Sequence, residues 1–147
     1  MSRGSAVYDV LRHVRPVVLE STRVVDSRVR GLGWTVGSRA VAELLRTLGP
    51  MTVPQMAETL SLARQNVQRH VDELVRQRHA RTLTNPAHRR SVLVDLTPAG
   101  VTAFDRLHAQ EVVDLASLAA ECTTEELATA ARVLAAFGND LRTRATS

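Results

Sequence analysis

The sequence predicts a mostly α-helical fold with a small β-wing, and two observations support this prediction. Apolar residues recur at spacings of three and four over long stretches on both sides of residues 80–96, which is typical of amphipathic helices. Within residues 80–96, two short runs, 80–84 and 91–96, favour strands, and the second places Val92 and Val94 at alternate positions. The residues between the two runs are expected to form the tip of a β-hairpin.

Composition limits the class of protein. A chain of 147 residues suits a single domain over residues 1–147, and no apolar run approaches the length of about 18 residues that a membrane span needs. No signal-like apolar block follows the N-terminus, so we expect a cytoplasmic protein. Cys122 is the only cysteine, which excludes an intrachain disulfide and a cysteine-based metal site. We interpret Cys122 as a small buried apolar residue rather than as a redox-active thiol.

The first half of the chain reads as a succession of helices. Residues 5–30 form a long amphipathic pattern, and Pro16 inside it predicts either a kink or two separate helices. After a break at residues 31–34, Thr35 is suited to cap a second helix, which Gly49 and the following proline end.

Two short helices then follow in close succession. Thr52 and Gln55 form a capping box that begins the third helix, and a turn over residues 60–63 leads to a fourth helix from Arg64 to about Gln77. Helices this close in sequence must cross at a large angle, as in a helix-turn-helix. Together with the hairpin, they predict a winged helix-turn-helix lobe over residues 34–97. The inner face of the fourth helix is expected to contain Val67, Val71, Leu74 and Val75.

Long helices at both ends of the chain predict a dimer. Thr97 and Pro98 begin one helix, and a second capping box, Thr123 with Glu126, begins the last helix. Together with the N-terminal helix, these helices expose more apolar surface than a small winged core can cover. We therefore assign residues 5–33 and 98–145 to a helical dimerisation region of a homodimer.

The outer face of the fourth helix carries side chains that are suited to DNA. Arginine, glutamine and asparagine can form paired hydrogen bonds with base edges or bind phosphates, and a tip with two arginines suits a minor groove. Residues 61–96 hold seven arginines against three acidic residues, whereas residues 97–147 hold four against seven. Asp72 and Glu73 would repel the DNA backbone, so the second half of the helix is expected to point away from it. An ordinary solvated charged surface remains an alternative. The candidate DNA-binding residues are Arg64, Gln65, Asn66, Gln68, Arg69, His88, Arg89 and Arg90.

Residues 85–100, with the sequence NPAHRRSVLVDLTPAG, resemble the wing and the Leu-Thr-x-x-Gly helix start of the multiple-antibiotic-resistance regulator (MarR) family. Leu74 and Arg90 also fall at the positions of that family's helix-ending leucine and wing-tip arginine. The resemblance runs nearly end to end. It implies an obligate homodimer that binds a palindromic operator in double-stranded DNA. It also implies a small-molecule pocket between the winged lobes and the dimer helices.

Three positions depart from the family pattern. His88 replaces the aspartate that braces the wing, which predicts a looser wing or a local charge that depends on pH. Arg78 replaces a glycine after the recognition helix. The backbone must therefore either leave the helix along a different path or hold a residue other than glycine in the left-handed conformation. Ala63 replaces a serine cap, so the helix loses one capping bond or starts at Ser61. The N-terminal helix has no cysteine, which disfavours a thiol switch.

The expected function is that of a sequence-specific DNA-binding transcriptional regulator, a repressor relieved by a small aromatic or anionic effector. The alternative is an architectural or partner-binding winged-helix protein without ligand control. No histidine spacing typical of a metal site and no glycine-rich phosphate loop is present, so we expect neither an enzyme nor a bound metal or cofactor. His70 is interpreted as a core or rim residue with satisfied hydrogen bonds. The candidate effector-pocket residues are Tyr8, His13, Arg15, Trp34 and His108.

Overall fold

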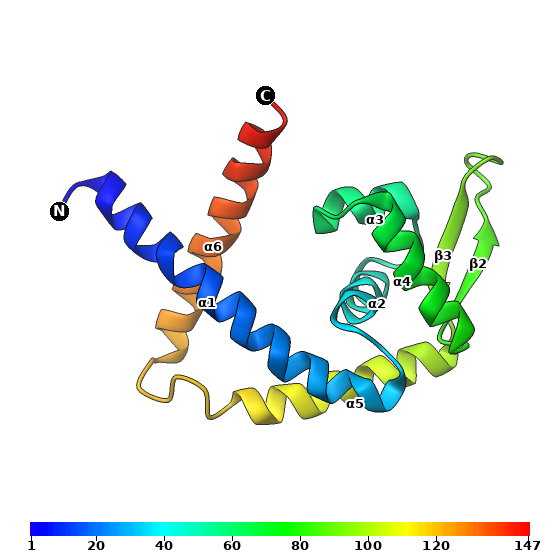
Figure 1. The fold of residues 1–147 in the computed structure, drawn as a ribbon, viewed down its shortest axis with the longest axis horizontal. Helices are drawn as coiled ribbons and strands as arrows, with labels where there is room; N and C mark the ends of the chain where they lie inside the picture. Colours follow the sequence, from blue (N-terminus) through cyan, green and yellow to red (C-terminus); the bar gives the residue numbers. More distant parts are fainter. The chain divides into compact units, whose positions relative to one another are not determined.

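The computed structural model describes all residues from 1 to 147, and they form two compact units, Met1–Ala109 and Gln110–Ser147. The chain contains helices α1 (Arg3–Val29), α2 (Val36–Leu48), α3 (Val53–Leu60), α4 (Arg64–Arg76), α5 (Pro98–Leu115) and α6 (Thr124–Ala145), a 3-10 turn η1 (Arg30–Leu32), and strands β1 (Met51–Thr52), β2 (Ala80–Thr84) and β3 (Val92–Leu96). The predicted fold class, mostly helical with a small β-wing, is confirmed (Figure 1). The boundary between the two units falls within α5.

The sheet has three antiparallel strands in the order β1-β3-β2. β2 and β3 form the predicted hairpin, and their last pair is Thr84 opposite Val92. The sequence analysis missed β1, which contributes only two residues and pairs Met51 with Val94. Because so short a strand contains no alternating pattern, sequence periodicity does not reveal it.

The core of the first unit lies between α2, α3, α4 and the sheet. Val41 and Leu45 of α2, Met56 of α3, and Val94 of β3 are all buried there. The inner face of α4 was predicted correctly at three positions and wrongly at one, because Val75 is exposed. The three buried apolar residues of α4 are Val67, Val71 and Leu74.

Most predicted helix boundaries are confirmed by side-chain caps. The hydroxyl groups of Thr35, Thr52 and Thr123 each accept a hydrogen bond from the backbone N–H three residues later, and all three belong to capping boxes. Ala63 caps α4 without any side-chain hydrogen bond, as its side chain requires. Arg78 has φ 60°, so the left-handed alternative predicted for this position is the one observed.

Two other expectations are settled by the structure. α1 is one helix that contains Pro16, so the prediction of two separate helices is wrong. Cys122 is exposed in the turn before α6, and its interpretation as a buried residue is also wrong. Burial is typical of a free cysteine as a residue type, but within this chain no element covers the turn. None of the helices combines the length and the apolar character that crossing a membrane requires.

An ion pair links α2 to α5 within the first unit. Arg46 donates hydrogen bonds to both carboxylate oxygens of Asp105, at 2.8 and 3.2 Å. The hydrogen bond from the guanidinium holds the pKa of Asp105 below its usual value. Since both side chains are about half exposed, the pair contributes little to stability.

Candidate nucleic-acid interface

Helix α4 buries one face and leaves the other in solvent. Val67, Val71 and Leu74 lie in the core, whereas Arg64, Gln65, Asn66, Gln68 and Arg69 are all exposed. The exposed residues occupy the first two turns of the helix. The buried side chains recur every three or four residues, which leaves these positions on the opposite face. The five candidate DNA-binding residues of α4 therefore lie on its solvent side. They can reach a partner without any rearrangement of the core.

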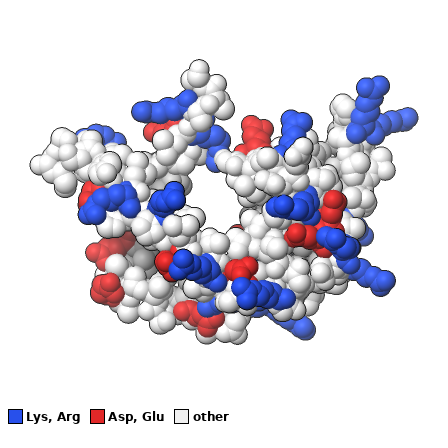
Figure 2. Space-filling view, in the orientation of Figure 1, with Lys and Arg blue, Asp and Glu red and all other residues white.

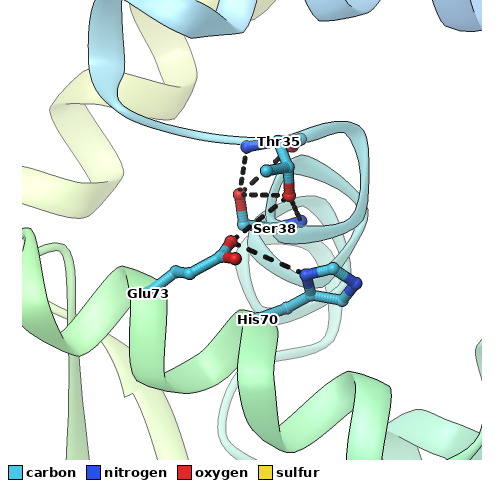
Figure 3. Close-up of polar contacts among 4 residues, drawn as sticks. All are labelled: Thr35, Ser38, His70 and Glu73. Atoms are coloured by element: carbon cyan, nitrogen blue, oxygen red, sulfur yellow. Dashed lines mark hydrogen bonds and ion pairs between the residues drawn. The ribbon is translucent and has the colours of Figure 1, made fainter.

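A polar contact fixes the buried side of α4 to the start of α2 (Figure 3). The hydroxyl group of Thr35 donates a hydrogen bond to Oε2 of Glu73 at 3.3 Å, while the same hydroxyl group accepts the capping bond from the N–H of Ser38. Glu73 therefore faces α2. This contact joins the recognition helix to the cap of its neighbour.

His70 lies beside this contact and is buried, as predicted, but its hydrogen bonds are not satisfied. Its Nδ1 has no hydrogen-bond partner, and the nearest acidic oxygen, Oε2 of Glu73, is 3.6 Å away (Figure 3). The other edge of the ring contacts α2 at Gly37, where a Cβ atom would overlap the imidazole. Gly37 thus allows the two helices to approach each other closely.

One of the exposed α4 side chains is held by its neighbour. The amide nitrogen of Gln68 donates a hydrogen bond to Oδ1 of Asp72 at 2.9 Å, one helical turn further along. This bond occupies a donor of Gln68 and leaves its amide oxygen as an acceptor. Spacing alone identifies Gln68 and Asp72 as neighbours, but it does not show which atom of the amide is engaged.

The end of α4 is joined to two other segments around His79. The N–H of His79 donates to the carbonyl oxygen of Leu74 at 2.8 Å, and the left-handed conformation of Arg78 makes this possible. The indole N–H of Trp34 donates to Nδ1 of His79 at 2.9 Å, and the N–H of Thr97 donates to its carbonyl oxygen at 3.0 Å. The recognition helix, the break after α1 and the start of α5 therefore meet at one residue.

The hairpin tip carries the second group of candidate residues. His88, Arg89 and Arg90 are exposed, and the tip projects beyond the helices of the lobe (Figure 1). β2 begins where α4 ends and returns alongside it, so the tip lies toward the end of the lobe where α4 starts (Figure 1). Figure 2 shows basic side chains projecting from this part of the surface, with no acidic side chain at the tip on the visible face.

The model of the MarR family matches residues 36–91, which include α2, α3, α4 and the hairpin tip. A crystal structure of a MarR family transcription regulator is 28% identical, with a TM-score of 0.80, and the match covers 98% of this chain and 95% of that one. The matched residues of the family model all lie within the winged-helix lobe.

Two further structures have the same fold. A structure named Multiple Antibiotic Resistance Repressor, MarR, is 26% identical, with a TM-score of 0.71 and coverage of 86% of this chain and 92% of that one. A mutant of MarR from E. coli, complexed with operator DNA, is 24% identical, with a TM-score of 0.75 and coverage of 93% and 99%. No curated protein sequence matches the chain.

The candidate effector residues differ widely in exposure. Tyr8 is 71% exposed and Trp34 only 3% exposed, and the ring of His108 stacks on Phe104 with the centroids 5.7 Å apart. His13 and Arg15 are exposed on α1. Helical spacing places such residues on a helix, but it does not show whether several helices bring them together.

A pocket does lie against the start of α5, with a volume of about 640 Å³. It opens to solvent and has a mostly apolar lining, with His79 and Arg106 as its basic residues. None of the five candidate effector residues lines it. The sequence analysis missed it because its apolar walls come from η1 and α5, segments that are far apart in the chain. These walls include Leu32, Pro98, Ala103 and Leu107.

Proposed function

We propose that this chain is a transcription regulator that binds duplex DNA as a homodimer, with α4 in the major groove and the hairpin tip beside it. The exposed polar face on the first two turns of α4 carries this proposal. A helix fits the major groove, and arginine, glutamine and asparagine are the side chains that read base edges there. The arginines of the tip suit the narrow, negative minor groove.

We assign distinct roles to the candidate residues. Arg64, Arg69, Arg89 and Arg90 bind phosphates or guanine edges, since a guanidinium can do both. Gln68 keeps its amide oxygen as an acceptor and one N–H as a donor for a base edge, because Asp72 engages only the other N–H. Gln65 and Asn66 face solvent beside these residues. The amide oxygen and the amide nitrogen of each side chain are available for a base.

The terminal helices supply the dimer contacts. Val17, Val18 and Leu19 of α1 and Leu127, Leu134 and Leu141 of α6 are exposed in the single chain. Large apolar side chains grouped on one element are typical of a subunit interface. A twofold axis places two α4 helices about one turn of DNA apart, which matches a palindromic operator.

We propose that the protein acts as a repressor and that a small aromatic or anionic effector relieves repression. The pocket at the start of α5 is the candidate site, since its walls are apolar and the guanidinium of Arg106 can attract an anion. His79 also follows α4 directly, so a ligand there contacts the segment that ends the recognition helix. In one state of the dimer, the spacing of the two lobes does not fit DNA. A ligand that binds this state more tightly than the DNA-binding state would shift the population toward it.

Selection of bound sequences from a random DNA pool tests the proposal, followed by gel-shift titration of the selected site. Arg69→Ala and Arg90→Ala should each weaken binding about tenfold or more, since each removes a charged contact that is worth about 1.5–3 kcal/mol. Arg76→Ala changes an exposed arginine in the last turn of the same helix, in the half that is expected to point away from DNA; it is the matched control and should leave affinity unchanged.

The same titration separates the alternatives. If the combined Arg69→Ala and Arg90→Ala variant binds the selected site as tightly as the wild type, the proposed interface is wrong. If selection enriches no sequence and affinity depends on salt alone, the protein is an architectural DNA-binding protein rather than an operator-specific regulator.

A further inference from the structure

The tip of the hairpin is closed by two side chains. After the last strand pair, Thr84 opposite Val92, the next two residues facing each other are Asn85 and Ser91. The amide nitrogen of Asn85 donates a hydrogen bond to the hydroxyl oxygen of Ser91 at 2.8 Å. This bond extends the hairpin by one step beyond the backbone ladder, and it closes the loop that carries the arginines.

Each of the two residues also fixes one half of the loop. The side-chain oxygen of Asn85 accepts a hydrogen bond from the N–H of Ala87 at 3.0 Å, and its carbonyl oxygen accepts one from the N–H of His88 at 3.2 Å. These bonds form a turn over residues 85–88. Pro86 occupies its second position, where its fixed φ favours the turn.

Ser91 organises the second half of the loop around His88. Its hydroxyl group donates to the carbonyl oxygen of His88 at 3.1 Å, and its N–H donates to the same oxygen at 3.0 Å. The resulting turn covers residues 88–91 and places Arg89 and Arg90 at its two central positions. Both arginine side chains are exposed there, outside the hydrogen bonds that hold the loop.

His88 contributes only its backbone to this arrangement. Its N–H and its carbonyl oxygen each take part in one of the two turns, and the hydrogen bonds at the tip do not involve its imidazole. The tip is therefore braced although the position occupied by aspartate in the family pattern holds a histidine.

We propose that Asn85 and Ser91 are positioning residues that hold Arg89 and Arg90 in the orientation that binds DNA. This inference rests on the proposed function of the hairpin tip. Because an unbraced loop would have to be ordered upon binding, its conformational entropy would weaken the complex. The two side chains remove much of this cost in advance, without touching the DNA.

The combined Asn85→Ala and Ser91→Ala variant tests the proposal. On the selected DNA site, the variant should bind about tenfold more weakly than the wild type. Its thermal unfolding midpoint should be unchanged, since the loop contributes nothing to the core. Ser91→Thr retains the hydroxyl group and should bind like the wild type. Thr82→Ala, an exposed residue of the same hairpin, is the matched control and should also bind normally.

A double-mutant cycle distinguishes positioning from direct contact. In a background with Arg89→Ala and Arg90→Ala, removal of Asn85 and Ser91 should have no further effect, because no guanidinium is left to position. A further loss in that background overturns the inference, and so does wild-type affinity in the combined Asn85 and Ser91 variant. If the wild type itself shows no preferred DNA site, the proposed function fails.

Discussion

Because Gly100 has no side chain, the start of α5 can lie close to the segment that precedes the hairpin. The residue lies against the backbone of His79, and a Cβ atom at this position would overlap the carbonyl group of His79. That carbonyl oxygen also accepts the hydrogen bond from the N–H of Thr97, whose hydroxyl group caps α5 by accepting from the N–H of Gly100. The close approach and the cap therefore depend on each other.

Gly100→Ala should destabilise the protein by about 1–3 kcal/mol, because rigid backbone atoms rather than a flexible side chain must give way. Urea unfolding followed by circular dichroism measures the difference in the free energy of unfolding. Gly31→Ala is the matched control, since a Cβ atom there meets open space, and it should be neutral or slightly stabilising. Equal effects of the two substitutions would refute the steric argument.

Single residues were predictable where a local rule applies. The caps Thr35, Thr52 and Thr123 follow from spacing alone, because a capping box involves residues three apart. The orphaned Nδ1 of His70 and the bond between Trp34 and His79 were not predictable, since their partners come from other elements. The same holds for the roles of Asn85 and Ser91, although both are turn-forming residues next to the predicted tip.

The start of α4 lacks the side-chain cap that begins α2, α3 and α6. Ala63 has the extended backbone of a cap residue, with φ −65° and ψ 141°, but no oxygen to accept a hydrogen bond. The N–H groups of Arg64 and Gln65 are therefore available to solvent or to a phosphate, whereas that of Asn66 donates to the carbonyl oxygen of Ala63 at 3.0 Å. This is the end of the helix that we place against DNA.

Ala63→Ser should stabilise the protein by about 0.5–2 kcal/mol, since its backbone already has the required conformation. Thermal or urea unfolding of the variant measures the gain. Thr52→Ala provides the converse case, because it removes an existing cap from α3 and should destabilise the protein by a similar amount. A neutral or destabilising effect of the serine would contradict the assignment of Ala63 as the cap.

The type and order of the long elements were predictable, whereas short or context-dependent ones were not. α2, α5 and α6 have both a periodic apolar face and a start signal, so their beginnings were placed correctly. β1 and the exposure of Val75 depend on which strand or helix lies opposite, and one sequence does not specify this. Pro16 was ambiguous because a proline inside a helix permits either outcome.

At the scale of the molecule, the chain leaves many large apolar side chains in solvent. Most of them lie on the terminal helices that we assign to the dimer, such as Val17 in α1 and Leu134 in α6. Burying apolar area is the main favourable term in subunit association, at about 25 cal/mol for each Å². The proposed dimer would remove this surface from water.

Analytical ultracentrifugation should find a species of twice the 16.1 kDa of one chain. The combined Val17→Glu and Leu134→Glu variant should shift the mass toward that of one chain, because charges buried in an apolar interface are strongly disfavoured. Leu48→Glu introduces the same charge at an exposed leucine of the lobe and should leave the dimer intact. A wild-type protein that sediments as a single chain at micromolar concentration would disprove the dimer.

The function class was accessible from the sequence because its determinants are local. The polar face of α4 and the arginines of the tip each lie within one short segment, so spacing and composition identify them. The pocket at the start of α5 brings together Leu32, His79 and Arg106 from three segments, and it appears only in the folded chain. Sequence reasoning chose other residues for the effector.

Trp34 gives this molecule an intrinsic optical probe at a useful place. It is the only tryptophan in the chain, it is buried, and its ring meets that of His79 edge-on, with the centroids 5.4 Å apart. All indole fluorescence therefore reports on the joint where the recognition helix ends. A change in emission on adding a small molecule or DNA would reveal movement at that joint in the unlabelled protein.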